Sequence, residues 1–138
     1  MTAPSPRIHI GTSGWNYPEW KGSFYPKDMK PAGMLAYYAE RFKTVEVNNT
    51  FYRMPTPKVV DGWAAGVPDG FVFVLKAPQR ITHFARLRDV DEPVRVFCDT
   101  ARALGPKLGP LLFQLPPHLR AGLGGRATAA SRRLLPRR

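Results

Sequence analysis

The segment Phe71–Ala77 restricts the fold of this chain more than any other stretch. It is apolar on both faces except for Lys76. A strand is apolar on both faces when it is covered from two sides, as in the parallel sheets of α/β proteins. The turn pair Asp69-Gly70 precedes the segment and Pro78 follows it. We therefore predict a strand inside a parallel sheet.

Strand-like and helix-like segments alternate along the chain. The expected strands cover residues 7–12, 43–48, 71–77 and 111–115, with helices starting at Pro31, Pro57 and Asp91 and a loop over 79–89. Helical crossovers between buried strands favour parallel neighbours with the helices outside. Two α/β architectures fit this order, namely a doubly wound sheet and part of an eight-stranded (β/α) barrel.

Each expected helix carries one apolar side. The residues on these sides are Met34, Leu35, Tyr38, Ala39 and Phe42, then Val59, Val60 and Trp63 in a helix that ends at Ala65, then Val94, Phe97, Cys98, Ala101 and Leu104 before Gly105-Pro106. One apolar side per helix is the pattern expected of helices that cover one face of a sheet.

Polar residues near the ends of the strands favour the barrel. If Val45 and Val47 face the helices, then Thr44, Glu46 and Asn48 face inward. By the same alternation Lys76 shares a face with Val72 and Val74, and Gln114 shares one with Leu112. Sites of (β/α) barrels are built at the carboxyl ends of the strands. We therefore expect a partial TIM barrel of about four parallel strands, with its site at that rim.

Four separated motifs support this expectation. They are GTSGWNYPEWKGSFYP (11–26), TVEVNNTFYRMP (44–55), FVFVLKAPQRITH (71–83) and LGPLLFQLPP (108–117). Together they resemble the YecE-like family, bacterial and archaeal proteins with a TIM-barrel fold that are described as a domain of unknown function. The resemblance runs from Ile8 to Pro117. It implies the fold and little chemistry, because a grouping with sugar-isomerase-like barrels rests on fold analogy alone.

The chain departs from this family in length. A complete barrel needs roughly 250 residues, whereas this chain has 138. We expect residues 1–117 to form the N-terminal half of the barrel domain, truncated before closure. Residues 118–138 hold six Arg and no acidic residue, and we expect this tail to be disordered or frameshifted. The alternative is a genuine half-barrel that closes as a homodimer through its open sheet edges.

Net charge and cysteine content suggest a compartment and one further partner. The net charge is +11, of which the tail supplies +6. A basic tail combined with aromatic loops would suit a nucleic-acid-binding module. A single cysteine, Cys98, fits a reducing compartment, so we expect a cytoplasmic protein. The chain shows no apolar run of signal-peptide or membrane-span length, and we expect no membrane partner.

Glu46 and Lys76 are the candidate catalytic residues. Adjacent strands would direct both side chains to the barrel mouth. There a carboxylate would act as a general base, and an ammonium group would stabilise a developing oxyanion. The alternative is a buried ion pair that only satisfies the barrel interior. The sequence leaves open whether the protein is an enzyme, a binding module or a non-functional fragment.

Further polar and aromatic residues are candidates for binding a small polar ligand, sugar-like or phosphorylated. The predicted ligand-binding residues are Ser13, Trp15, Tyr17, Trp20, Asn48, Asn49, Thr50, Tyr52, His83 and Gln114. Most have a structural alternative: turn chemistry for Asn48–Thr50, a barrel plug for the aromatic residues of 15–25, a solvated loop for His83, and the polar network of Glu46 and Lys76 for Gln114. The sequence GTSG at 11–14 is not a dinucleotide fingerprint, and no P-loop is present.

Neither a metal nor a cofactor is expected. His9, His83 and His118 are scattered without the spacing of metal ligands, and Cys98 lies on the apolar side of a helix. We therefore predict that Cys98 belongs to the core.

Overall fold

The computed structural model describes residues 8–120 of the chain, and the structural statements below concern those residues. The predicted basic tail, 118–138, lies outside them except for its first three positions. None of the helices they form is long and apolar enough to cross a membrane.

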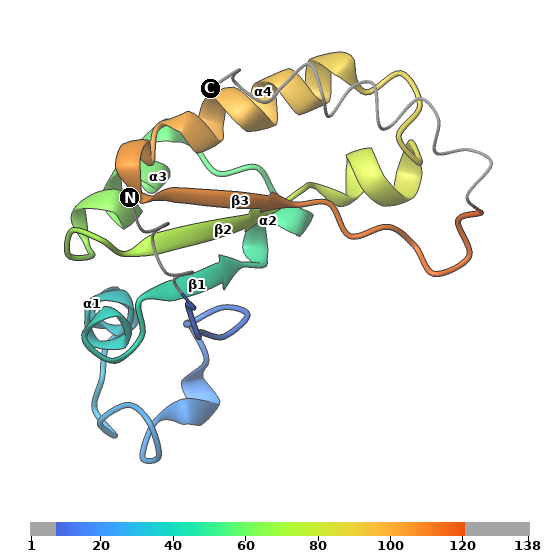
Figure 1. Cartoon of the computed structure of the whole chain (residues 1–138). Coiled ribbons are helices and arrows are strands. Elements are labelled where there is room, and N and C mark those ends of the chain that lie inside the picture. The colour runs from blue at the N-terminus through green and yellow to red at the C-terminus, as the bar shows by residue number, and fades with distance from the viewer. Residues whose placement is uncertain (1–7, 121–138) are drawn as a thin grey trace, which may run out of the picture.

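The sheet contains three parallel strands in sequential order. They are β1 (Thr44–Val47), β2 (Val72–Lys76) and β3 (Leu108–Leu112), and β2 lies between the other two. Figure 1 shows the three arrows pointing the same way. A doubly wound sheet reverses its strand order at a switch point, whereas a barrel adds each strand on the same side of the last. The order β1-β2-β3 contains no reversal, which agrees with the predicted partial barrel.

Four α-helices and three short helical turns accompany the strands. The helices are α1 (Pro31–Arg41), α2 (Asn49–Tyr52), α3 (Pro57–Ala65) and α4 (Asp91–Arg102), and the turns are η1 (Pro18–Trp20), η2 (Arg80–Phe84) and η3 (Gly105–Lys107). Of these, η1 and α1 precede β1. The predicted bounds of α3 are confirmed at both ends. Its start is specified locally, because the Thr56 side chain accepts a hydrogen bond from the Val59 N–H and Pro57 occupies the first turn.

The core lies between one face of the sheet and helices α1, α3 and α4. The sheet supplies Val45, Val47, Phe73 and Leu75, each at most 1% exposed. The helices supply Leu35, Tyr38, Ala39, Val60, Val94, Phe97, Cys98 and Ala101, and the connecting segments add further buried side chains. Burial of each large apolar side chain contributes about 1.5–3 kcal/mol. The predicted core position of Cys98 is confirmed, and burial raises the pKa of its thiol.

The first predicted strand, 7–12, is wrong as a buried strand. Ile8 and Ile10 are 84% and 73% exposed, and the segment reaches the sheet only at Ser13, which forms a single parallel bridge with Glu46. Hydrogen bonds from Glu46 N–H to the Thr12 carbonyl and from Gly14 N–H to the Glu46 carbonyl make this bridge. No helix formed by the described residues covers Ile8 and Ile10. These two apolar side chains are therefore exposed, although the sequence pattern predicts that they are buried.

The last strand starts three positions earlier than the predicted 111–115. Gly109 and Pro110 resemble strand breakers in the sequence, yet both lie inside β3. A Cβ atom at position 109 would lie 2.4 Å from Val72 Cγ1, so the glycine permits the close approach of β3 to β2. Pro110 is exposed on an edge strand, where a missing N–H is tolerated. Gln114 consequently lies beyond the strand.

Three smaller expectations also fail. The 79–89 loop contains a π-helical turn, η2, which the scattered charges of the sequence did not indicate. Val59 is exposed, because Val60, Trp63 and Ala64 are the residues of α3 that turn toward the core. Leu104 is buried as predicted but lies after α4, which ends at Arg102.

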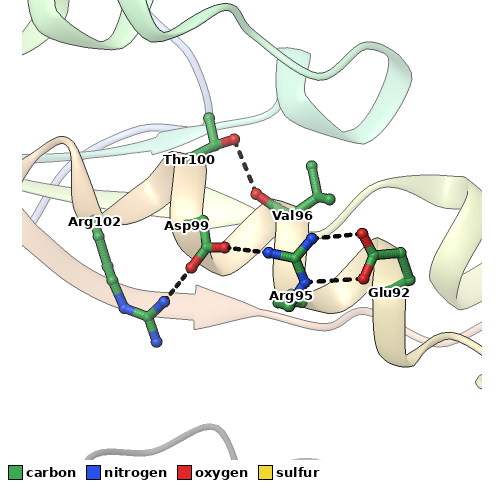
Figure 2. A network of polar contacts seen from close by, with 6 residues as sticks. All are labelled: Glu92, Arg95, Val96, Asp99, Thr100 and Arg102. Carbon is green, nitrogen blue, oxygen red and sulfur yellow. Dashed lines mark hydrogen bonds and ion pairs between the residues drawn. The ribbon is translucent and has the colours of Figure 1, made fainter.

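The outer surface of α4 carries a chain of ion pairs (Figure 2). Arg95 bridges Glu92 and Asp99, and Asp99 also pairs with Arg102. The Arg95 hydrogen bond lowers the pKa of the Glu92 carboxyl. Exposed pairs of this kind contribute little to stability. The charged face of α4 thus points outward, and its apolar face lies on the sheet.

The aromatic segment 15–25 packs mainly on itself and on α1. The Phe24 ring meets Tyr37 edge-on at 5.7 Å, and Tyr25 stacks with Trp20 at 6.0 Å. Tyr25 is only 2% exposed and its hydroxyl donates to the Trp15 carbonyl. Burial, together with the nearby Tyr38, raises the pKa of Tyr25 to about 12. These rings therefore form part of the folded core of the N-terminal segment.

The backbone conformation of Arg86 gives a first prediction. Arg86, Leu87 and Asp89 all have positive φ, and Arg86, with φ of 49°, is also exposed. The left-handed region is unfavourable for a residue with a Cβ. Replacing Arg86 by Gly should raise the free energy of unfolding by up to about 1 kcal/mol in urea titrations. The control Arg88→Gly, where φ is not positive, should lower it by about 0.5–1 kcal/mol; equal losses in both variants would contradict the backbone account.

Tyr25 gives a second prediction, on pH. Its folded pKa of about 12 exceeds the ordinary value of 10.0. The unfolded chain therefore loses this proton first, so the stabilisation is complete below about pH 10 and is lost as pH rises toward about 12. Absorbance of the phenolate band should show one tyrosine titrating late, and Tyr25→Phe should remove that component. Tyr52→Phe, at a position 67% exposed, should leave it in place; loss of the late component in this control would refute the assignment.

Candidate functional site

The carboxyl ends of β1 and β2 bring the two predicted catalytic residues to one face of the sheet. In the parallel register Glu46 lies beside Val74, and the next inward position, Asn48, lies beside Lys76. Glu46 and Lys76 are thus diagonal neighbours on the face that the helices do not cover. Both are half-buried.

Glu46 is held by the segment that precedes α1. The Ser13 hydroxyl donates to Glu46 Oε1 at 3.1 Å. Tyr38 of α1 fixes this segment, because its buried hydroxyl accepts from the Thr12 N–H at 2.8 Å and donates to the Thr44 carbonyl at 3.0 Å. The predicted site residue Ser13 therefore lies directly against Glu46.

Lys76 is held from the other side by residues at and after the end of β1. Its ammonium donates to Asn48 Oδ1 at 3.2 Å and lies 4.6 Å from the centre of the Phe51 ring. The Phe51 ring also contacts His83, and the two rings meet edge-on with their centres 5.0 Å apart. His83 Nδ1 in turn lies 2.8 Å from the Thr82 hydroxyl. An ammonium group that lies above the face of an aromatic ring is stabilised by a cation–π interaction.

Glu46 and Lys76 do not form an ion pair with each other. Each has a neutral partner instead: a serine hydroxyl for the carboxylate, and an amide oxygen and a ring for the ammonium. The alternative of a buried ion pair that merely satisfies the interior is therefore not supported. Two opposite charges therefore remain on one face of the sheet, without a direct contact between them.

An open cleft of about 260 Å³ adjoins this pair through Asn48, which lines the cleft and accepts from Lys76; Glu46 and Lys76 themselves do not line it. It separates the loop after Ser13 from the end of β1. Its lining includes four predicted ligand-binding residues, and the full set is Gly14, Trp15, Asn16, Tyr17, Val47, Asn48 and Asn49. A cleft lined by amides, an indole and a phenol beside a carboxylate provides hydrogen bonds and stacking surfaces for a small polar molecule.

The remaining predicted site residues lie elsewhere or are used internally. Trp20 stacks within the aromatic segment and does not line the cleft. Thr50 is fully buried, and its hydroxyl lies 2.9 Å from the Val47 carbonyl oxygen and 2.6 Å from that of Lys76. Tyr52 is exposed on α2, and Gln114 is exposed beyond β3.

Phe51 and Asn16 belong to this region but were not among the predicted site residues. Phe51 supports the Lys76 ammonium, and Asn16 lines the cleft. The only sequence signal for Phe51 was the aromatic pair after a polar turn, which did not indicate which ring would lie under a charged group. Within residues 8–120 no group of three or more His, Cys, Asp or Glu side chains could hold a metal ion.

Comparison with known proteins decides the family. A family model described as "Protein of unknown function DUF72" matches residues 9–137. The chain belongs to the DUF72 family. The UPF0759 protein YecE of Escherichia coli strain K12 is 36% identical over 109 residues, which cover 79% of this chain and 38% of that protein. The UPF0759 protein YunF of Bacillus subtilis strain 168 is 30% identical over 116 residues, which cover 80% and 40%.

Solved structures of DUF72 proteins confirm the fold. One from Thermotoga maritima superposes with a TM-score of 0.77 and 28% identity over 94% of this chain and 52% of that one. Another, from Enterococcus faecalis, gives 0.74 with 20% identity over 93% and 47%, a likeness that concerns the fold alone. The chain spans about 38–40% of the curated relatives and about half of these structures. The predicted partial barrel and the YecE-like resemblance are both confirmed.

Thr50 supplies the prediction for this site. Its hydroxyl ties α2 to the carbonyl ends of β1 and β2. Thr50→Val keeps the shape but leaves buried carbonyl oxygens without this donor, so the free energy of unfolding should fall by about 1–3 kcal/mol. Thr50→Ser retains the hydroxyl and should lose less, as measured by urea unfolding. If valine and serine are equally stable, the hydroxyl does not hold the strand ends together.

Proposed function

We propose that this face of the sheet binds a small polyhydroxylated, sugar-like molecule and that Glu46 and Lys76 act on it. One observation carries the proposal: a carboxylate and an ammonium group share the strand-end face beside an open cleft, and each keeps a separate neutral partner. Polar side chains grouped at the carboxyl ends of parallel strands are the usual basis of barrel sites.

The chemistry of the pair follows from its placement. A carboxylate on this face is suited to take a proton from a bound hydroxyl or from a carbon beside a carbonyl. A fixed ammonium group nearby is suited to stabilise the oxyanion that such a step generates. The proposed reaction class is therefore proton transfer on a carbonyl-containing or polyhydroxylated compound, carried out by the full-length barrel of which this chain spans about half.

The other predicted partners remain separate proposals. The comparisons provide nothing that favours nucleic acid, and the tail on which that alternative depends lies largely outside the described residues. Pairing between two copies through the edges of the sheet stays a prediction, as does the alternative of a non-functional fragment. A cytoplasmic location also remains a proposal, supported by the single cysteine, which is free and buried.

Binding of polyols tests the proposal. NMR titration of the 138-residue chain with D-glucitol or D-gluconate should shift the amide signals of Gly14, Asn48 and Asn49. Glu46→Gln should weaken binding of either polyol by about tenfold, since it removes a charged acceptor of hydroxyl hydrogen bonds. The matched control Glu40→Gln changes an exposed carboxylate of α1 and should leave binding unchanged. If neither polyol shifts these signals, the proposed function is wrong.

A further inference from the structure

Two charged side chains, Glu46 and Lys76, are the ionisable groups on the helix-free face of the described strands. Thr44, Val72, Val74 and Leu112 occupy its other inward positions. A ligand on this face therefore meets one positive and one negative group, which lie diagonally across the neighbouring strands β1 and β2.

The contacts of Lys76 make it a fixed cation. The Asn48 amide oxygen and the face of the Phe51 ring are both partners that a positive group prefers. Neither contact neutralises the charge. The Lys76 backbone is fixed as well, since the Thr50 hydroxyl lies 2.6 Å from its carbonyl oxygen. Within residues 8–120 this cation has no ionic partner, and a fixed cation of this kind at a strand end is an anchor for a negatively charged ligand group.

Glu46 limits how negative that group can be. A phosphate dianion at Lys76 would meet one cation and, diagonally, one carboxylate, whereas phosphate sites combine several N–H donors or guanidinium groups. A carboxylate carries a single charge and fits one ammonium. Glu46 Oε1 accepts from Ser13, and Oε2 has no hydrogen-bond partner among residues 8–120, so it is placed to accept from a ligand hydroxyl.

We propose that the ligand is a hydroxy acid of the sugar-acid type, with its carboxylate at Lys76 and Asn48 and its hydroxyls toward Glu46 and the cleft. This inference rests on the proposed function and makes it more specific. In this arrangement Phe51 is a positioning residue, because it acts on the ligand only through the ammonium that it supports.

Probes that share one carbon chain and differ at their ends test the inference. Calorimetric or NMR titration of the full 138-residue chain compares D-gluconate with neutral D-glucitol, with the dianion D-glucitol 6-phosphate and with the zwitterion D-glucosaminate. Gluconate should bind about tenfold more tightly than glucitol, which corresponds to one charge-assisted contact. It should also bind more tightly than the phosphate and the zwitterion.

Variants identify the residues responsible. Lys76→Met should remove the preference for gluconate over glucitol by weakening gluconate binding more than glucitol binding, a readout that a purely structural role of Lys76 would not produce. Lys76→Arg should restore part of the preference. Phe51→Leu should reduce it by a few-fold, since exposed to half-buried cation–π contacts are modest. Lys43→Met, which removes an exposed lysine next to β1, is the matched control and should change nothing.

The outcomes separate the two proposals. Equal binding of gluconate and glucitol, or tighter binding of the phosphate or the zwitterion, would overturn the hydroxy-acid inference and leave polyol binding in place. The same holds if Lys76→Met keeps the preference for gluconate. Absence of binding by every probe would overturn the proposed function and this inference together.

Discussion

The parallel pairing of β1 with β2 is the interaction on which the candidate site depends. In this register Asn48 lies beside Lys76, and Glu46 lies one inward position earlier on the same face. A slip of β1 by one residue would turn Glu46 and Asn48 toward the helices and away from Lys76, because strand side chains alternate between faces. The same slip would remove Val45 and Val47 from the core. Packing of the core therefore also determines where the polar side chains point.

Separate partners for the two charges follow from this arrangement. Ser13 holds Glu46 from the segment before α1, whereas Asn48 and Phe51 hold Lys76 from the end of β1 and α2. A direct ion pair would satisfy both charges and leave little interaction for a ligand. Neutral partners orient the charged groups without cancelling them, which is the arrangement expected of a prepared binding site.

The accuracy of the sequence predictions varied with how local their physical basis was. The bounds predicted for α3 were correct, and the structure shows that its start has a local basis, because Thr56 caps it and Pro57 occupies the first turn. β3 was misplaced because Gly109 and Pro110 signal a break in most contexts, and only the proximity of Val72 and the open edge of the sheet makes them acceptable. The gathering of Ser13, Asn48 and the two charged residues followed from the rule on strand ends, yet the contact of Phe51 with Lys76 did not.

The sequence by itself determined the order of α1, β1, α3, β2, α4 and β3, the bounds of α3, the alternation that directs polar residues to one face, and the family. These features depend on residues within a few positions of one another and on motifs read directly from the chain. The tertiary structure alone decided that the strand order contains no reversal, that the 7–12 segment is only bridged to the sheet at Ser13, and that Thr50 is buried while Glu46 and Lys76 keep separate partners. These features depend on contacts between residues far apart in the chain, and such contacts exist only after the helices have packed on the sheet.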